Sequence, residues 1–345
     1  MIKTAILGST GIVGQKFTQL LLNHPWFDIS IVAGSKRSAG LKYGEAIGSK
    51  FSCDLPENIF ELEVMPTTLE SVNDTDIIFS ALPSSIAGKV EEDFAKAGYT
   101  VFSNASSHRM AEDVPILNPE VNGDHIRLIE EQKRRRGWSG AIITNPNCTS
   151  AILSLSLKPI FEKFGIRCAI ISTMQAISGA GYHGVPSIDI IDNVIPFIKN
   201  EEEKIKNETL KILGAPFKIA DFKISASCHR VATIDGHLLA VFLETETEAS
   251  PEEIIETMDK FSGDPQELKL PSAPKKPIIV KHEEDRPQPR IDRLEGNGMS
   301  VVVGRVRKDE VLKGIKYVVL GHNTIRGAAG CSILNAEYLK TKKYI

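Results

Sequence analysis

MIKTAILGSTGIVGQKFTQLLLNH, residues 1–24, decides the fold. An apolar run typical of a strand leads straight into glycines at positions 8, 11 and 14, and an apolar pattern with helical spacing follows. Two such glycines allow a tight turn and close approach of the backbone to a phosphate, and the third lets the helix pack on the strand. The stretch predicts a dinucleotide-binding turn formed by Gly8, Ser9, Thr10, Gly11, Ile12 and Val13, with a glycine turn that binds nothing as the alternative.

The next predicted strand, FDISIVAG, ends without the Asp or Glu that would hold the ribose 2′-hydroxyl of NAD. Ser35, Lys36, Arg37 and Ser38 follow it instead. Two cations and two hydroxyls suit a 2′-phosphate through charge-assisted hydrogen bonds. We therefore expect NADP(H) as cofactor, the alternative being an ordinary solvated loop.

Strand-like and helical runs alternate as far as GAIITN at 140–145, which predicts an α/β fold with a Rossmann-type doubly wound parallel sheet. Longer strand-like runs follow residue 148, so we expect an α+β catalytic and dimerisation domain with a mostly antiparallel sheet. The predicted domains are 1–147 for NADP binding and 148–323 for catalysis and dimerisation, with a C-terminal helix at about 324–345 packing back onto the first. Six prolines between 262 and 292 indicate an extended segment rather than a third domain.

Composition excludes several classes of protein. A net charge of −3 over 345 residues gives no general attraction to nucleic acid, and the basic run at 133–136 is typical of a helix end capped by Gly137. No apolar stretch approaches the roughly 20 residues that span a bilayer, and the N-terminus is no signal peptide. We expect a cytoplasmic protein with no membrane partner. The five cysteines are scattered and lack a C-x-x-C pair, so no disulfide framework or metal site is expected.

TNPNCTS, residues 144–150, surrounds a cysteine with polar residues. Cys148 lies between a predicted strand and an apolar run that reads as a helix opening near Thr149 or Ser150. Unsatisfied N–H groups at a helix N-terminus favour a thiolate and could hold an oxyanion on a carbonyl that the sulfur attacks. The position predicts a catalytic nucleophile. A buried structural cysteine is the alternative, and that is the role we expect for Cys53, Cys168, Cys228 and Cys331.

A thiolate beside a nicotinamide site indicates a dehydrogenase that works through a thioester, whose carbonyl accepts hydride more readily than a carboxylate does. Such an enzyme needs an acid/base, and His237 in SASCHRVATIDGHL is the best candidate, with His229 as the alternative. Arg230 could capture a substrate carboxylate in bidentate fashion. Residues seven apart on one strand face opposite sides, so Asp235 and Gly236 must bend the chain if Arg230 and His237 face one site.

Seven motifs together resemble one family: GSTGIVG, NASSHRM, NPNCTS, QAISGAG, CHRVATIDGH, GMSVVVGRVR and NTIRGAAG. Over nearly the whole chain the sequence is similar to aspartate-semialdehyde dehydrogenase, in the branch found in archaea and fungi. The resemblance implies reversible NADP-dependent conversion between L-aspartate 4-semialdehyde with phosphate and L-aspartyl 4-phosphate, on the route to lysine, threonine and methionine. It also implies a homodimer or homotetramer.

The resemblance assigns the nucleophile to Cys148 and the acid/base to His237, which would assist proton transfer as a thiohemiacetal collapses. Substrate binding falls on Arg230 for the carboxylate, Arg109 and Lys204 for phosphate, Glu201 for the amine, and Asn147 and Gln175 for orienting the substrate and thioester. Three successive glutamates at 201–203 leave the register of the Glu201 and Lys204 assignments open. Ser178, Gly179 and Asn323 should lie near the nicotinamide.

Three other functions stay open. An archaeal malonyl-CoA reductase would share the cysteine and histidine chemistry, but it would want a CoA site and no amine contact; the stretches NASSHRM and PNCTS favour the aspartyl phosphate enzyme. N-acetylglutamyl-phosphate reductase is a more distant relative. A non-catalytic NADP-binding regulator on the same scaffold would be expected to have lost Cys148 or His237.

Overall fold

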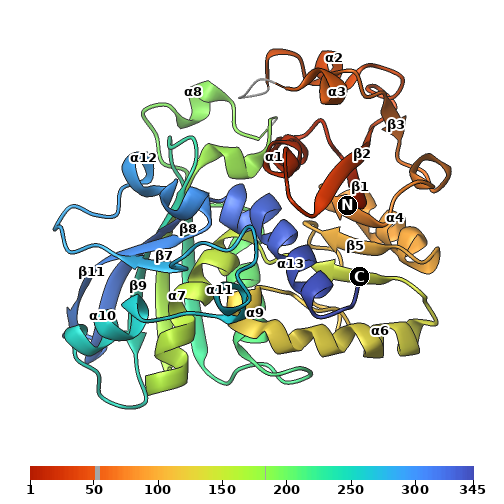
Figure 1. Cartoon of the computed structure of the whole chain (residues 1–345). Helices are drawn as coiled ribbons and strands as arrows, with labels where there is room; N and C mark the ends of the chain where they lie inside the picture. Colours follow the sequence, from red (N-terminus) through yellow and green to blue (C-terminus); the bar gives the residue numbers. More distant parts are fainter. Residues whose placement is uncertain (51–54, 183) are drawn as a thin grey trace. The chain divides into compact units, whose positions relative to one another are not determined.

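The computed structural model describes residues 1–50, 55–182 and 184–345, so Cys53 lies outside the described residues (Figure 1). The chain forms two compact units. Unit 1 comprises Met1–Ile116, Ile126–Asn145 and Ser332–Ile345, and unit 2 comprises Leu117–His125 and Pro146–Cys331. No helix of the described residues is long and apolar enough to cross a membrane.

Unit 1 contains a six-stranded sheet in the order β3-β2-β1-β4-β5-β6, with every neighbouring pair parallel. Its strands are β1 (Ile2–Leu7), β2 (Phe27–Gly34), β3 (Val64–Pro66), β4 (Ile77–Ser80), β5 (Thr100–Ser103) and β6 (Ala141–Thr144). The order reverses beside β1, as in doubly wound nucleotide-binding sheets. The predicted Rossmann-type parallel sheet is therefore confirmed.

The helices of unit 1 are α1 (Ile12–Leu21), α2 (Tyr43–Ile47), α3 (Glu57–Phe60), α4 (Ser84–Lys96), α6 (Leu128–Arg136) and most of α13 (Gly330–Thr341). Helix α6 ends at Gly137 with φ +66°, so the basic run at 133–136 is a helix end, as predicted. The C-terminal helix starts at Gly330, later than the expected 324, because a π-helical turn (Ile325–Ala329) precedes it and Ala328 leaves helical backbone angles.

The core of unit 1 includes a row of phenylalanines that joins helix to sheet. The Phe79 ring of β4 stacks on Phe17 of α1 at 4.9 Å between centroids and touches Phe102 of β5 at 5.5 Å. All three side chains are buried. Burial of such rings is the main favourable contribution to folding, and it fixes α1 and its glycine turn against the sheet.

Unit 2 contains a mixed six-stranded sheet in the order β10-β11-β12-β9-β7-β8. The strands are β7 (Cys168–Gln175), β8 (Lys223–Arg230), β9 (His237–Glu244), β10 (Ile278–Val280), β11 (Val301–Asp309) and β12 (Gly314–Gly321). The three central pairings are antiparallel and the two outer ones are parallel. The mostly antiparallel second sheet is therefore confirmed.

Along β9 buried and half-buried residues alternate strictly, so one face of the sheet is covered and the other is more open. The helices of unit 2 are α5 (Pro119–Asn122), α7 (Cys148–Phe164), α8 (Ser187–Ile190), α9 (Glu201–Leu213), α10 (Pro251–Asp259), α11 (Asp264–Glu267) and α12 (Pro289–Asp292). Helix α7 contacts β11, β12 and α9. The N-terminus of α7, where Cys148 lies, is the centre of the candidate site.

Candidate active site

Helix α7 begins at Cys148 itself, earlier than the predicted Thr149 or Ser150. The cause is Asn147, whose side-chain Oδ1 accepts hydrogen bonds from the backbone N–H of Thr149 at 2.9 Å and of Ser150 at 3.3 Å. Asparagine is among the best N-cap residues because it satisfies these groups. Cys148 therefore occupies the first turn of the helix, half-buried rather than in the core.

The Asn147 cap corrects one part of the sequence-based expectation. The N–H groups at the N-terminus of this helix were expected to be unsatisfied, but Asn147 Oδ1 already accepts from those of Thr149 and Ser150. The cap therefore occupies two of the N–H groups that could hold an oxyanion.

His237 lies directly against the cysteine. Its Nε2 is 3.1 Å from Cys148 Sγ, and its Nδ1 accepts a hydrogen bond from the backbone N–H of Ala176 at 3.1 Å. The ring is fully buried, and burial, followed by the charges of Arg230 and His322, lowers the pKa of His237 to about 3. Burial and the nearby charges therefore both favour the neutral form of the ring.

Arg230 and His237 converge although they are seven residues apart. Arg230 ends β8 and His237 begins β9, and both strands pair with β7, which lies between them. The predicted bend is present, since Gly236 has φ +99°. A Cβ placed on Gly179 would lie 3.1 Å from Arg230 Nη1 and 3.2 Å from His237 Cε1, so both side chains press on the same glycine.

His229, the alternative to His237, turns elsewhere: its Nδ1 lies 3.0 Å from the carbonyl oxygen of Thr173. Arg230 is buried and donates from Nη1 to the carbonyl of Ala176 at 2.6 Å. Burial lowers the pKa of Arg230, whose normal value is so high that the guanidinium stays charged. The pairing with sulfur thus belongs to His237, and Arg230 adds a buried positive charge beside it.

Two buried glutamates accept hydrogen bonds from Asn147, the residue before Cys148. Glu201, the first residue of α9, accepts from Asn147 Nδ2 at 3.0 Å, and Lys204 Nζ lies 3.7 Å from its other oxygen. Glu208 Oε2 accepts from the backbone N–H of Asn147 at 2.6 Å. Glu202 and Glu203 are exposed, so of the three successive glutamates only Glu201 points at this cluster.

Sequence reasoning missed Glu208. Residues 201 and 208 are seven apart, two turns of one helix, and therefore share a face. That spacing was the available signal, but nothing local indicates that the face meets the start of α7.

The remaining expected residues of unit 2 lie around the same strand ends. Gln175 ends β7, is buried, and donates from Nε2 to Thr173 Oγ1 at 3.3 Å. Asn323 accepts from the N–H of Gly236 at 2.8 Å and donates to Ser178 Oγ at 2.8 Å. Asn323 thus ties the turn before His237 to the segment that carries Gly179.

Gly327 was also missed. It lies in the π-helical turn, and a Cβ there would be 2.6 Å from Cys148 Cβ and 2.8 Å from Cys148 Cα. Only a residue without a side chain fits at this distance. The π-helical turn therefore packs directly on the backbone of Cys148. Such turns are often found at functional sites in proteins.

In unit 1 the glycine turn packs closely against neighbouring backbone. Gly8 has φ +71°, and a Cβ there would meet the Ala81 carbonyl oxygen at 2.7 Å; a Cβ on Gly14 would be 2.2 Å from the Gly8 carbonyl oxygen. Gly11 is the N-cap of α1 and makes no side-chain cap bond. Thr10, Gly11, Ile12 and Val13 are all half-buried. Backbone N–H groups at such a helix start bind phosphate groups, so this turn fits a dinucleotide.

The loop after β2 forms a turn that carries two cations. Ser38 closes a turn on the carbonyl of Ser35, with its N–H at 2.9 Å and its hydroxyl at 3.1 Å. Lys36 and Arg37 are exposed on this turn. The two cations are thus displayed at the end of β2, where doubly wound folds meet the adenosine ribose.

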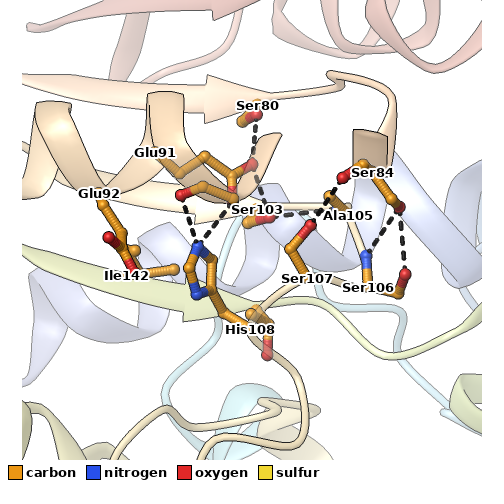
Figure 2. Close-up of polar contacts among 12 residues, drawn as sticks. Ser80, Ser84, Glu91, Glu92, Ser103, Ala105, Ser106, Ser107, His108 and Ile142 are labelled. Atoms are coloured by element: carbon orange, nitrogen blue, oxygen red, sulfur yellow. Dashed lines mark hydrogen bonds and ion pairs between the residues drawn. The ribbon is translucent and has the colours of Figure 1, made fainter. Parts of the chain in front are cut away.

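Arg109 is buried in unit 1 and donates from Nη2 to the Asn104 carbonyl at 2.7 Å. The loop just before it rests on a buried acid. Glu91 of α4 accepts at Oε1 from Ser80 Oγ at 2.6 Å and from Ser103 Oγ at 2.8 Å, and its Oε2 lies 3.9 Å from His108 Nε2 (Figure 2). Burial raises the pKa of Glu91 to about 7.

The chain matches two models of semialdehyde dehydrogenases, an NAD binding domain over residues 3–129 and a dimerisation domain over residues 157–326. It is 53% identical over 344 residues to the aspartate-semialdehyde dehydrogenase of Methanothermobacter thermautotrophicus, covering 98% of this chain and 99% of that protein. The chain belongs to the aspartate-semialdehyde dehydrogenase family. The predicted family resemblance and the predicted fold class are confirmed.

Two further proteins are similar to this chain over its whole length. The crystal structure of aspartate-semialdehyde dehydrogenase with NADP from Candida albicans is 41% identical, with a TM-score of 0.91 and complete coverage of both chains. A malonyl CoA reductase (NADP) from Metallosphaera sedula is 42% identical over 352 residues, covering 100% of this chain and 98% of that protein.

Proposed function

We propose that the protein is an NADP-dependent aspartate-semialdehyde dehydrogenase, which interconverts L-aspartyl 4-phosphate and L-aspartate 4-semialdehyde with phosphate on the route to lysine, threonine and methionine. The observation that carries the proposal is the contact of 3.1 Å between Cys148 Sγ at the start of α7 and the buried ring of His237. A sulfur held this way can form and release a thioester.

In the proposed mechanism the Cys148 thiolate attacks the acyl carbon of aspartyl phosphate. The new C–S bond forms as the C–O bond to phosphate breaks, and the product is a thioester. Before the attack, His237 Nε2 lies 3.1 Å from this sulfur. The first turn of α7 adds its dipole, which favours negative charge at this position.

Arg230 supplies the buried cation that would pair with the substrate carboxylate. Glu201 would meet the substrate amine, and its position beside Asn147 supports this role because the amine and the reacting carbon belong to one small molecule. Gln175 and Asn147 are assigned to orienting the substrate and the thioester. Asn147 does so through the cap that places Cys148.

Arg109 and Lys204 are the proposed phosphate contacts. Arg109 keeps a buried guanidinium in unit 1, and Lys204 is half-buried on the first turn of α9 in unit 2. Guanidinium and ammonium groups both stabilise a leaving phosphate by charge-assisted hydrogen bonds.

NADP(H) would be held by the turn from Gly8 to Val13, by Ser35 to Ser38, and by Ser178, Gly179 and Asn323. When bound, the nicotinamide supplies or accepts the hydride. Gly8 and Gly14 support this assignment because side chains there would collide with backbone, so only glycine permits the tight strand–turn–helix connection of such a site. Lys36 and Arg37 support a preference for the 2′-phosphate of NADP.

Self-association is supported by the match to a dimerisation domain over residues 157–326. We propose a homodimer, or a homotetramer built from it, located in the cytoplasm.

Malonyl-CoA reduction is the second candidate, favoured by the relative that is 42% identical over the whole chain. The test is phosphate-dependent reduction of NADP with L-aspartate 4-semialdehyde, run beside NADPH oxidation by malonyl-CoA, on wild type and Cys148→Ala. Semialdehyde activity that vanishes in Cys148→Ala supports the proposal. Turnover of malonyl-CoA alone would move the protein to the reductase class, and activity with neither would favour a binding protein.

A further inference from the structure

Arg326, in the π-helical turn before α13, has a side chain that is completely buried in unit 2. Its Nε donates to the carbonyl of Met299 at 2.7 Å. Its Nη2 and Nη1 donate to the two carboxylate oxygens of Glu120 in α5, at 2.5 Å and 3.0 Å. The side chain of Glu120 is completely buried too, so the two charges form a bidentate pair away from water.

Stability alone does not explain why such a pair is buried. Removing two charges from water can cost as much free energy as their attraction returns, and apolar residues of similar size often stabilise a fold equally well. What the pair holds in place is therefore more informative than its strength.

The pair holds a turn of an uncommon kind. In the turn Ile325–Ala329, the N–H of Gly327 donates to the carbonyl of His322, five residues earlier, at 3.0 Å. Such π-helical bonding is rare and occurs mostly as single turns, often at functional sites. The turn therefore depends on contacts outside itself, and the Arg326 side chain supplies several of them.

Asn118 joins the same guanidinium to helix α7. Its Oδ1 accepts from Arg326 Nη1 at 3.4 Å, and its Nδ2 donates to the carbonyl of Ala151 at 3.2 Å and to Ser154 Oγ at 3.3 Å. Ala151 lies three residues after Cys148, about one turn along the helix. The π-helical turn and the start of α7 are therefore both tied to Arg326.

Gly327 connects this arrangement to the candidate nucleophile. It follows Arg326 directly, and a Cβ there would lie 2.6 Å from Cys148 Cβ and 3.3 Å from the Cys148 carbonyl oxygen. The backbone of the turn is thus packed against Cys148 with no room for a side chain between them. A shift of the turn would either push Cys148 or leave a gap beside it.

We propose that the buried pair of Arg326 and Glu120 positions Cys148 for reaction, by holding the π-helical turn and the start of α7 at a fixed spacing. The inference rests on the proposed role of Cys148 as nucleophile. Arg326 and Glu120 are positioning residues: they act through Gly327 and Asn118, and no bond forms or breaks at either of them.

The informative variant removes the whole pair. Arg326→Met or Glu120→Leu alone leaves a buried charge without its partner and should lower the midpoint of thermal unfolding strongly. The double variant Arg326→Met/Glu120→Leu leaves neither charge, so much of that loss should be recovered. It does not restore the bidentate contact that fixes the turn.

The half-reaction without phosphate separates position from stability. Each variant is mixed rapidly with L-aspartate 4-semialdehyde and NADP at a temperature where it is fully folded, and the burst of NADPH is followed by absorbance. We expect the double variant to keep the burst amplitude of the wild type and to lose about 10²-fold in burst rate, as misplacement of a reacting group by about 1 Å does. A burst rate that recovers together with thermal stability would overturn the inference.

Arg326→Lys tests the inference even if the double variant does not fold. Lysine keeps the charge but not the planar fork that reaches several acceptors, so we expect full burst amplitude and a burst rate at least about fivefold below that of the wild type. A wild-type burst rate in Arg326→Lys would overturn the inference.

Tyr317→Phe is the matched control. It removes a buried hydrogen bond of 2.9 Å to Ser156, which lies in the middle of α7. The burst rate should be unchanged. Equal slowing in Tyr317→Phe and Arg326→Lys would mean that any lost contact to this helix has the same effect, which would contradict a specific role of Arg326.

These outcomes separate the inference from the proposed function. A wild type that reduces malonyl-CoA and gives no burst with the semialdehyde would reject the proposed function, and the same comparison of rates with malonyl-CoA would then support or overturn the role of the pair. A wild type inactive with both substrates would reject both. An active wild type with an unaffected double variant would reject the inference alone.

Discussion

The two units bury titratable groups by different means. In unit 2 the groups beside Cys148 are held by backbone N–H donors: Ala176 donates to His237, and Asn147 donates to Glu208. In unit 1 the buried Glu91 is held by the hydroxyls of Ser80 and Ser103 (Figure 2). A backbone N–H can only donate, but a hydroxyl can donate or accept. At these two positions of unit 2 the partner of the N–H must be a hydrogen-bond acceptor, whereas the hydroxyls around Glu91 can accommodate either state of the acid.

The largest effect that we expect concerns Glu91. Burial raises its pKa from 4.5 to about 7 in the folded state. The folded pKa is the higher one, so the folded state keeps its full stability below pH 4.5 and loses it as pH rises to about 7, by about 3 kcal/mol in total. In Glu91→Gln this loss should disappear.

The measurement for Glu91 is urea unfolding from pH 4.5 to 8, followed by tryptophan fluorescence. Both tryptophans, Trp26 and Trp138, belong to unit 1, so the signal reports on the unit that contains Glu91. The matched control is Glu92→Gln, which removes the neighbouring, less buried acid of α4. Parallel pH curves for wild type and Glu91→Gln would show that the cluster does not titrate in this range.

Gly327→Ala tests the packing around Cys148 in unit 2. The new Cβ would lie 2.6 Å from Cys148 Cβ, so the nucleophile or the π-helical turn must shift. Misplacement of a reacting group by about 1 Å can cost about 10²-fold in rate, and we expect kcat to fall by that order. Steady-state kinetics would check this against Gly88→Ala, where the nearest atom to a new Cβ is 3.5 Å away. Unchanged kcat in Gly327→Ala would mean that Cys148 is not the reacting group or tolerates the shift.

Variants of Glu208 test whether its side chain must accept the hydrogen bond from the backbone N–H of Asn147. Glu208→Ala leaves the buried N–H of Asn147 without this acceptor and should destabilise unit 2 by about 1–3 kcal/mol while lowering kcat. Glu208→Gln keeps an oxygen acceptor and should cost less on both counts. Glu203→Gln, on the exposed side of the same helix, is the control for charge. Thermal unfolding and kcat would decide, and equal effects of the Gln and Ala variants would contradict the acceptor role.

The smallest effect is expected at the exposed cations of unit 1. Replacing Lys36 and Arg37 together by alanine should raise KM for NADP by about tenfold and leave KM for NAD nearly unchanged, because solvent screens exposed ion pairs. Salt should weaken NADP binding in the wild type more than in the double variant. A proportional rise in KM for both cofactors would remove the assignment of this loop to the 2′-phosphate.

Features that depend on residues close together in the chain are predictable from the sequence. The glycine turn, the alternation of strands and helices, and the polar setting of Cys148 lead to the observed parallel sheet and to a cysteine at a helix start. The bend at Gly236 also follows from local chemistry, since glycine readily adopts φ +99°.

Long-range contacts were not predictable in this way. Glu208 reaches Asn147 across 61 residues, and His237 reaches Ala176 across 61 residues. Each side chain is one of several of its type with nothing local to distinguish it, and the partner of each is a backbone group of another segment. The cap formed by Asn147 depends on neighbouring residues, and an asparagine just before a predicted helix can be seen in the sequence. That its Oδ1 accepts from the N–H groups of both Thr149 and Ser150 is known only from the observed geometry.

The most direct test of the proposed chemistry is the half-reaction without phosphate. Wild type is mixed rapidly with L-aspartate 4-semialdehyde and NADP, NADPH is followed by absorbance, and the quenched protein is analysed by peptide mass spectrometry. The account predicts a burst of about one NADPH per subunit and an aspartyl group on the peptide that contains Cys148, released when phosphate is added. A burst that survives in Cys148→Ala, or an acyl group on another residue, would contradict it.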